Sequence, residues 1–225
     1  MLRKRLMKQG AIFDMDGLLF DTERIFRDSW TETARRFGQR PRPDFPAAVA
    51  GTSGAGMREV IRRYYPEADP FAFQESCLSR AAEVIKEGIP EKPGVREILE
   101  FFRAKNVKLA VASSSLRNMI ADNLSRAGID GYFDAVVSGE DVSRGKPEPD
   151  IFLLAAQKLG CSPESCYVFE DGINGVRAGI AAGCATIMIP DLFEPPEELR
   201  ASCAGIYPNL LAAQRAIERL WQIEQ

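Results

Sequence analysis

Histidine does not occur anywhere in this chain of 225 residues. Its absence removes the most frequent general base of enzymes, the base of a serine triad and the most frequent protein ligand of zinc. Any acid–base chemistry in this protein therefore falls to carboxylates or to lysine.

Long apolar runs are also missing. No stretch approaches the ~18 uninterrupted apolar residues of a membrane-spanning helix, and the basic start, residues 1–8, is not followed by the apolar region of a signal peptide. The cysteines form no CxxC pair, and the five of them are Cys77, Cys161, Cys166, Cys184 and Cys203. An odd set without metal-ligand spacing is typical of reduced core residues, so we expect a cytoplasmic protein that does not bind membranes.

The phosphate-binding patterns GxGxxG and GxxxxGK[ST] are absent, which disfavours the nucleotide-binding folds that depend on them. A net charge of −3 and a sequence pI near 5.3 give no reason to expect nucleic acid as a partner. An apolar content of 45% is ordinary for a globular protein. We expect a monomer or a weak homo-oligomer.

Short apolar runs alternate with amphipathic segments over most of the chain, and this alternation predicts an α/β fold, a parallel sheet with helices on both faces. The expected strands are residues 10–13, 107–112, 135–137, 166–169 and 185–189. The expected helices between them are residues 95–105, 116–127, 151–159 and 173–182.

A different pattern separates the first strand from the next helix. Helices are expected at residues 22–37, 57–65 and 71–87, and Pro41, Pro43 and Pro46 break the chain after the first of them. We therefore predict a small helical cap domain, residues 20–90, inserted into a core domain of residues 1–19 and 91–225.

Two carboxylates stand directly after the first strand, in the segment Asp14-Met15-Asp16-Gly17. A strand has a side-chain period of two, so both would point the same way if the extended conformation lasted that far. Like charges at that spacing need a bound metal, a shared proton or hydrogen bonds to compensate them. An Asp-Gly turn is the simpler alternative.

The later strands also end in polar residues, namely Ser113-Ser114-Ser115, Lys146-Pro147 before a helix, and Glu170-Asp171-Gly172. Each segment alone is compatible with a helix cap or a turn. In a parallel sheet, however, the strand ends meet at one edge and there form a crevice. Oxygen ligands without His or Cys then predict Mg²⁺ together with a phosphate group.

These residues resemble the motifs of the haloacid dehalogenase-like (HAD) phosphohydrolase superfamily, over Ala11 to Ile189. The four motifs correspond to Asp14-Met15-Asp16-Gly17, Ser113, Lys146 and Glu170-Asp171. The small residues that follow, among them Gly175 and Gly179, resemble the β-phosphoglucomutase-like subgroup, in which a helical cap follows the first motif. The resemblance implies a Rossmann-like core with that cap.

The resemblance also implies roles for the motif residues. Asp14 would attack phosphorus and form an aspartyl phosphate, and Asp16 would act as general acid and then general base. Ser113 and Lys146 would hold the transferring group. Mg²⁺ would be held by Asp14, the backbone carbonyl of Asp16, and Asp171 with Glu170 in support. Dehalogenases and phosphonate hydrolases of the superfamily lack the second aspartate, so Asp16 favours phosphate esters.

The identity of the substrate depends on two other regions, the loop after the second motif and the cap. The expected substrate-binding residues are Ser114, Ser115, Arg117 and Asn118 in the loop after the second motif, and Gly51, Thr52 and Arg58 in the cap. A β-phosphoglucomutase carries a cap histidine where Phe26 stands here, and a cap arginine where Gly54 stands.

We therefore expect a Mg²⁺-dependent phosphatase for a small phosphorylated metabolite, such as a sugar phosphate. A phosphosugar mutase of the β-phosphoglucomutase type is the first alternative. A non-catalytic phospho-receiver or regulatory protein is an alternative of another class, although receivers carry their acid pair before the hydroxyl and have no cap.

Overall fold

The computed structural model describes residues 8–49, 52, 54–191 and 195–223. The chain divides into two compact units, and each is described here by itself. One, called the core unit below, comprises the described residues of Met1–Asp21 and Pro90–Gln225, and the other, the helical unit, those of Thr22–Ile89.

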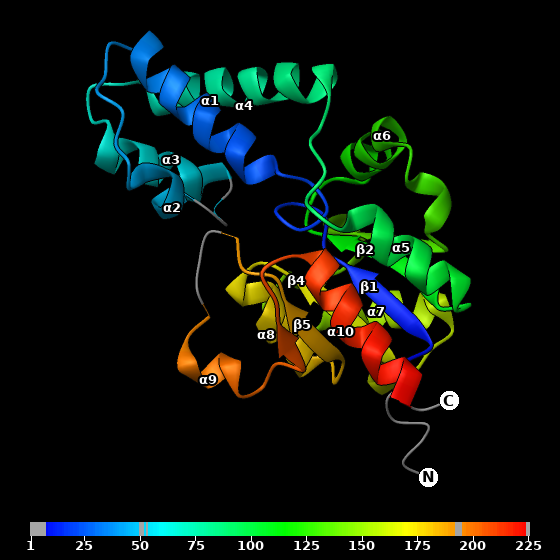
Figure 1. Ribbon diagram of the computed structural model, residues 1–225. Coiled ribbons are helices and arrows are strands. Elements are labelled where there is room, and N and C mark those ends of the chain that lie inside the picture. Colours follow the sequence, from blue (N-terminus) through cyan, green and yellow to red (C-terminus); the bar gives the residue numbers. More distant parts are fainter. Residues whose placement is uncertain (1–7, 50–51, 53, 192–194, 224–225) are drawn as a thin grey trace. The chain divides into compact units, whose positions relative to one another are not determined.

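The core unit contains a six-stranded sheet whose strands all run parallel, in the order β3-β2-β1-β4-β5-β6 (Figure 1). The strands are β1 Gly10–Phe13, β2 Lys108–Ser113, β3 Ala135–Ser138, β4 Cys166–Glu170, β5 Ala185–Met188 and β6 Gly205–Ile206. Phe13, the last residue of β1, lies opposite Val111 of β2 and Phe169 of β4. Both neighbours continue past the end of β1, β2 to Ser113 and β4 to Glu170.

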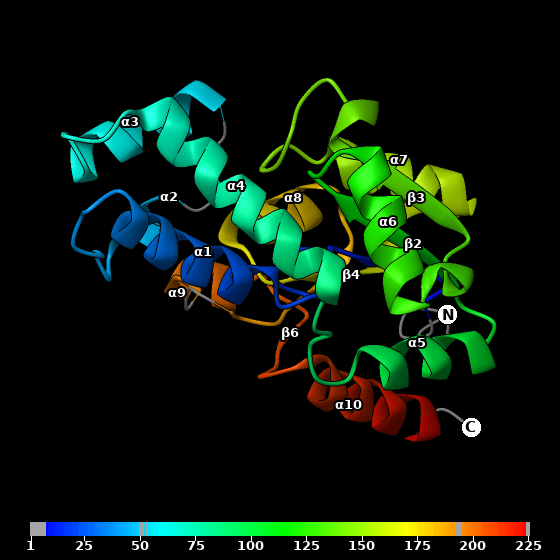
Figure 2. The same cartoon turned by 90° about the horizontal axis from the view of Figure 1, so that it is seen from above.

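Helices cover both faces of this sheet, as Figures 1 and 2 show. Helices α5 (Val95–Ala104) and α10 (Leu210–Ile223) cover one face, and α7 (Asp150–Leu159) and α8 (Ile173–Ala181) cover the other. The other helical segments in the described part of the core unit are α6 (Arg117–Ala127), α9 (Glu197–Arg200) and the 3-10 turns Asp130–Tyr132, Gly139–Asp141 and Pro163–Ser165.

The two faces of the sheet are packed differently. On the α7 side, Ile12, Ala112 and Val168 pack with Phe152 and Ala155 in a buried cluster of mainly small and branched side chains. The opposite face is aromatic. The rings of Phe13 and Phe169 are stacked with centroids 4.7 Å apart, and Phe102 of α5 lies beside both. The alternation of side chains along β1 thus places Ile12 and Phe13 in separate halves of the core.

The predicted parallel α/β fold is confirmed, and it includes elements that the sequence pattern did not indicate. The prediction extends no further than residue 189, and so misses β6 and α10. Helix α10 buries Leu210, Ala213, Ile217 and Trp221, a spacing of three or four residues that is typical of an amphipathic helix. Periodicity could therefore have identified it.

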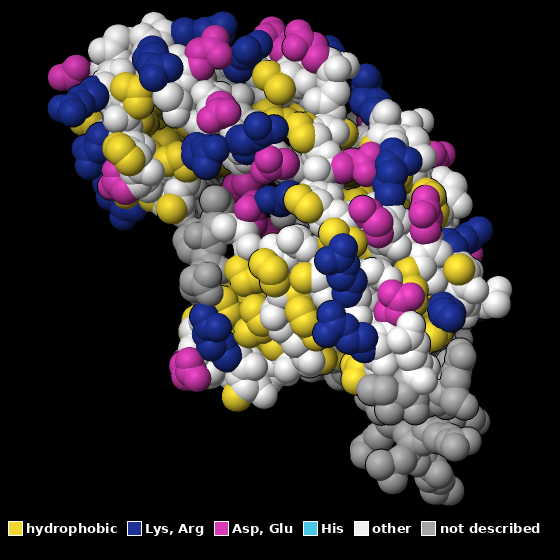
Figure 3. All heavy atoms as spheres, in the orientation of Figure 1, with side chains coloured by type: hydrophobic (Ala, Val, Ile, Leu, Met, Phe, Trp, Pro, Cys, Tyr) yellow, Lys and Arg dark blue, Asp and Glu magenta, His cyan; other side chains and the backbone are white. Residues whose placement is uncertain are grey.

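The helical unit consists of α1 (Thr22–Arg36), α2 (Phe45–Val49), α3 (Gly54–Tyr64) and α4 (Pro70–Glu87). Its core is a cluster of rings in which Phe73 contacts Trp30, Phe45 and Tyr65. Helix α2 forms in the proline-containing segment, where only a break was predicted. Charged side chains of both signs are interspersed on the face of this unit seen in Figure 3.

The two segments that lead out of and back into the core unit are paired with each other. The amide of Asp21 donates to the carbonyl of Pro90 at 2.9 Å, and the amide of Lys92 donates to the carbonyl of Leu19 at 2.9 Å. An antiparallel bridge joins Phe20 and Glu91 between these bonds. The segments 19–21 and 90–92 therefore form a short two-stranded ladder.

The structure also bears on membrane-spanning helices and on the state of the cysteines. Within the described residues, no helix combines the length and the apolar character needed to cross a membrane. The five cysteines are free thiols, and burial raises the pKa of Cys166 to about 12 and that of Cys184 to about 11.

Candidate functional site

The polar residues predicted to meet do so at the carboxyl end of the sheet. From β1 the chain continues to β2 and β3 on one side, whereas β4, β5 and β6 lie on the other, so the direction of the strand order reverses between β1 and β4. Ligand sites of open parallel sheets lie at such reversal points. Asp14 follows β1 and Asp171 follows β4, so both stand at this point.

Lys146 connects the acidic residues of the site. Its Nζ donates to Asp14 Oδ1 at 2.5 Å and to Glu170 Oε1 at 2.6 Å, and it lies 3.4 Å from the carbonyl oxygen of Ala112. The three charged side chains are 10%, 9% and 3% exposed for Lys146, Asp14 and Glu170. Burial alone lowers the pKa of Lys146, but the charges of Asp14 and Glu170 outweigh it and raise that pKa above its ordinary value. Lys146 is therefore a firmly held cation.

Two carboxyl groups of the site, those of Asp14 and Asp171, have raised pKa values. Burial raises the pKa of Asp14 to about 7, with the charges of Glu170 and Asp16 acting in the same direction and Lys146 against them. Burial, together with the charges of Glu170 and Asp14, also raises the pKa of Asp171 well above its usual range. Carboxylates that crowd each other in this way favour the binding of an additional cation.

Asp16 is held by the serine loop that follows β2. Its Oδ2 accepts hydrogen bonds from Ser115 Oγ at 2.7 Å and Ser113 Oγ at 3.3 Å. Ser113 Oγ also accepts from the amide of Ser115 at 3.1 Å, and the buried Ser138 donates to the carbonyl of Ser115 at 2.8 Å. The hydroxyls thus fix one oxygen of a half-buried carboxylate beside Asp14.

Two glycines leave room for the acidic side chains. Gly17 has φ +84°, in the left-handed region, and a Cβ there would overlap the carboxylate of Asp171. A Cβ on Gly175 would overlap the carboxylate of Glu170. Glu170 Oε2 accepts from the amide of Gly172 at 3.0 Å, so both of its oxygens have hydrogen-bond partners. Gly17 and Gly175 therefore contribute to the site by leaving space for its carboxylates.

The donors at this edge fit a hard cation in kind. Among the described residues, no group of three or more Cys, Asp or Glu side chains converges as a ready metal cage. Mg²⁺ does not require one, because it is commonly bound by one or two carboxylates, with waters and substrate phosphate oxygens completing its octahedron. Asp14 and Asp171 supply carboxylate oxygens and no nitrogen or sulfur ligand competes, so the residues present fit Mg²⁺.

The other residues expected in the serine loop have different surroundings. The guanidinium of Arg117 forms an ion pair with Asp141, and its amide donates to Glu140 Oε2 at 2.8 Å. Asn118 Oδ1 accepts from the amide of Met119 at 2.9 Å, and Ser114 is exposed. Of this loop, only Ser113 and Ser115 contact Asp16. The substrate-binding roles of Ser114, Arg117 and Asn118 stay predictions.

The cap residues expected to bind substrate lie in the helical unit. Thr52 Oγ1 donates to the carbonyl of Val49 at 2.6 Å, and Arg58 donates to Gln74 Oε1 at 3.2 Å. Gly51 lies outside the described residues. The substrate-binding roles of these three residues stay predictions.

Sequence reasoning missed several residues that shape the site. It placed Glu170 with the metal, a role that stays a prediction, and did not indicate the ion pair of Glu170 with Lys146. It gave no role to Ser138, which supports the serine loop, or to Gly139, where a Cβ would lie 2.8 Å from the carbonyl oxygen of Ser114. A polar residue followed by glycine at the end of β3 was the available signal.

Comparison with known proteins identifies the family and relatives of this chain. Residues 8–183 match the family model of the haloacid dehalogenase-like hydrolases. A phosphorylated carbohydrates phosphatase of Thermotoga maritima is 34% identical over 180 residues, which cover 80% of this chain and 83% of that protein. A fructose-1-phosphate phosphatase of Escherichia coli is 32% identical over 177 residues, covering 77% and 92% of the two chains.

One solved structure matches a larger share of this chain than the two phosphatases do. A crystal structure of a candidate β-phosphoglucomutase from Thermotoga maritima superposes with a TM-score of 0.80 at 29% sequence identity. The match covers 94% of this chain and 99% of that one. Both the fold and the order of its elements are therefore shared with a protein of similar length.

Proposed function

This chain belongs to the haloacid dehalogenase-like hydrolase family, and from that premise we propose that it is a phosphatase acting on small phosphorylated carbohydrates. The observation that carries the proposal is the buried Lys146 ammonium, held between Asp14 and Glu170 beside the serine-bound Asp16. The names of the two phosphatase relatives support the carbohydrate class.

Asp14 is the nucleophile of the proposed reaction. Its carboxylate oxygen attacks phosphorus, the bond from phosphorus to the sugar oxygen breaks, and an aspartyl phosphate forms on Asp14. Lys146, already 2.5 Å from Asp14, stabilises negative charge on the phosphoryl oxygens as they pass the lysine. Glu170 positions the ammonium from its other side. Phosphoryl transfer depends mainly on such positioning and charge stabilisation.

Asp16 moves the protons. It donates a proton to the leaving sugar oxygen, and the resulting carboxylate then takes a proton from the water that hydrolyses the aspartyl phosphate. Ser115 holds one of its oxygens at 2.7 Å, which fixes the direction in which the other faces. Ser113 is 1% exposed at the end of β2, and its hydroxyl would donate a hydrogen bond to the phosphoryl group.

Asp14, the backbone carbonyl of Asp16, and Asp171 are the residues that would hold Mg²⁺. The ion supplies charge neutralisation when bound, so that a phosphate dianion can approach the carboxylates. Glu170 supports the site by holding Lys146, since both of its oxygens are engaged.

The mutase alternative finds less support in the described residues. A mutase must also hold the phosphate that is not transferred, and Arg117 is the basic residue of the serine loop expected to do so. Its guanidinium is paired with Asp141. A product assay separates the reactions: β-glucose 1-phosphate with a bisphosphate primer yields glucose 6-phosphate from a mutase and inorganic phosphate from a phosphatase.

The direct test measures inorganic phosphate released from a panel of hexose, pentose and hexitol phosphates. We expect activity with Mg²⁺ and none after treatment with EDTA. Turnover that persists in EDTA would contradict the magnesium site, and absence of turnover on the whole panel would contradict the carbohydrate class. An aryl phosphate serves as the general positive control.

Asp14→Asn is expected to lower kcat/KM by at least about 10³-fold, because an amide cannot act as the nucleophile. The matched control is Asp122→Asn, which makes the same change on the exposed face of α6. Circular dichroism of both variants checks the fold. Undiminished phosphate release by Asp14→Asn would exclude Asp14 as the nucleophile.

A further inference from the structure

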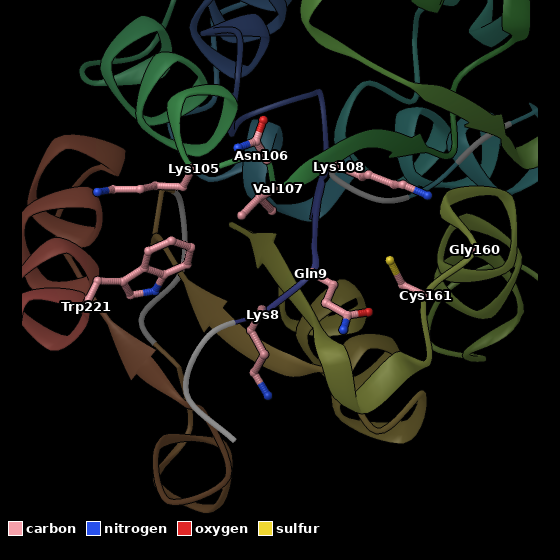
Figure 4. Close-up of a pocket in the computed structure, with 9 residues that line it drawn as sticks. All are labelled: Lys8, Gln9, Lys105, Asn106, Val107, Lys108, Gly160, Cys161 and Trp221. Atoms are coloured by element: carbon pink, nitrogen blue, oxygen red, sulfur yellow. The ribbon is translucent and has the colours of Figure 1, made fainter. Parts of the chain in front are cut away.

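A cavity opens at the amino-terminal end of the sheet, opposite the site around Asp14. It has a volume of about 420 Å³ and is lined among others by Lys8, Gln9, Lys105, Lys108 and Trp221. Figure 4 shows Trp221 on the α10 side, Lys8 and Gln9 at the start of β1 in the middle, and Cys161 on the other side. Nothing in the proposed phosphatase reaction uses these residues.

The charge of this cavity is of one sign. Three lysines line it, and none of its described lining residues is acidic, although the whole chain carries a net charge of −3. Lys8 Nζ donates to the carbonyl of Glu164 at 2.6 Å, and Lys108 Nζ donates to the carbonyl of Leu159 at 2.7 Å. An ammonium has three donors, so these bonds hold the two lysines at the cavity and leave further protons for a ligand.

The lysines exceed what the neighbouring helices require. Helices α5, α7 and α10 all end near this cavity, and each carboxyl end contributes roughly half a negative elementary charge. Three ammonium groups against roughly one and a half negative charges leave an excess of roughly one and a half positive charges. Capping of the helix ends therefore does not account for all the lysines.

An independent observation at the same cavity concerns Trp221. Its side chain is buried, with the residue 4% exposed, and its ring packs against Phe101 with centroids 5.7 Å apart. The indole Nε1 is buried and has no hydrogen-bond partner among the described residues. Indole nitrogen is a donor only, and an unsatisfied buried donor is costly. An oxygen-rich ligand in the cavity would supply the missing acceptor.

We propose that this cavity binds a small metabolite carrying a phosphate group, through Lys105, Lys108 and the indole of Trp221. The cavity has the size typical of small-molecule sites. It is separate from the site around Asp14, because Gln9 lines the cavity and β1 then runs to the other edge, about 16 Å away at about 3.3 Å per residue. The assignment does not depend on the phosphatase activity.

The test uses nuclear magnetic resonance, because the chain has only two tryptophans and each gives one indole signal. The ¹⁵N-labelled Asp14→Asn protein is titrated with inorganic pyrophosphate in EDTA, and Trp30→Phe assigns the two signals. We expect the Trp221 signal to shift and saturate, while that of Trp30, buried in the helical unit, stays in place. Asp14→Asn keeps hydrolysis out of the measurement.

The matched variants are Lys105→Gln with Lys108→Gln, both exposed, and Arg103→Gln with Arg126→Gln as a control of equal charge loss outside the cavity lining. We expect the lysine pair to raise the dissociation constant at least about tenfold, because the two ammonium groups supply the charge contacts with the anion. The arginine pair should change it less than about twofold.

Three results would overturn the assignment. The Trp221 signal fails to move, or it moves in proportion to pyrophosphate without saturating, or the lysine and arginine pairs weaken binding equally. The amide spectrum recorded in the same experiment shows that each variant is folded, so that none of these results can be attributed to unfolding.

Discussion

The two ends of the same six strands carry opposite charge in different surroundings. At the carboxyl end, Asp14, Glu170 and Asp171 crowd around one lysine, and the charged groups are nearly all buried. At the amino end, lysines line an open cavity without an acidic residue among its described walls. Helix amino ends face the first edge and helix carboxyl ends the second, so the charges at both edges complement the helix dipoles.

The two edges also differ in how far their lysines are buried, and burial governs what a lysine contributes to stability. Lys146 is 10% exposed and bridges two carboxylates, whereas Lys108 is exposed and bonds to one carbonyl. Removal of one partner from a buried pair leaves an uncompensated charge in a low-dielectric interior. Removal of an exposed lysine leaves a group that water can solvate.

The largest effect is expected from Lys146→Met compared with Lys108→Met. Lys146→Met leaves Asp14 and Glu170 buried without their cation, and should lower the free energy of unfolding by about 3–5 kcal/mol. Lys108→Met loses a hydrogen bond at a helix end and should cost about 1 kcal/mol or less. Urea unfolding in EDTA measures both, because EDTA removes metal ions that could replace the lysine. Equal losses would break the comparison.

A smaller effect is expected from added methyl groups. Gly175→Ala places a Cβ inside the space of the Glu170 carboxylate and should destabilise the protein by about 1–3 kcal/mol. It should also lower phosphatase activity, because Glu170 positions Lys146. Gly131→Ala, in the turn before β3 and with no atom within 4 Å of the new Cβ, should change stability by less than about 0.5 kcal/mol. Thermal unfolding and phosphate release are the two measurements.

Full stability and full activity of Gly175→Ala would contradict the prediction that an added Cβ at this position displaces Glu170. That result would show that Glu170 can leave its place without cost. Glu170→Gln then provides the second measurement, since it keeps the shape of the side chain and removes only the charge next to Lys146.

The smallest effect is expected at the exposed rim of the carboxyl end. The amide of Ser138 and the guanidinium of Arg117 hold the pKa of Asp141 below its ordinary value of about 3.9. A lowered pKa means that its contribution to stability is present above about pH 4 and is lost as the pH falls through the lowered value. Asp141→Asn should therefore lower stability at pH 6 by no more than about 1 kcal/mol, and the deficit should shrink toward pH 2.

The control for the Asp141 prediction is Asp122→Asn, an exposed aspartate of α6 outside this network. Chemical unfolding of the wild type and both variants across the pH range gives the three curves. A deficit of Asp141→Asn that grows as the pH falls would have the wrong sign for a lowered pKa.

Much of the candidate site could be predicted because it depends on strand ends. Asp14, Ser113 and Glu170 each stand at the end of a short buried run, and a parallel sheet brings such ends to one edge whatever the intervening loops do. Local pattern and topology were therefore enough to place them together. The predicted strands lie close to the observed ones for the same reason.

The rest depends on partners that are distant in the sequence. Nothing local indicates that Arg117 pairs with Asp141, or that Glu170 turns to Lys146. The cavity at the amino end was not predicted, since its walls come from residues 8–9, residues 105–108, residues 160–161 and residue 221. Helix α10 was missed although its periodicity is regular.

The short ladder between residues 19–21 and 90–92 has a consequence for how such a protein can change over time. The amide of Asp21 lies 2.9 Å from the carbonyl of Pro90, so the two ends of the intervening segment are already held together within the core unit. The entropy cost of a longer connection grows only slowly with its length. We therefore expect this junction to tolerate insertions of different length between residues 21 and 90 without a change in the sheet or in the charged residues at its carboxyl edge.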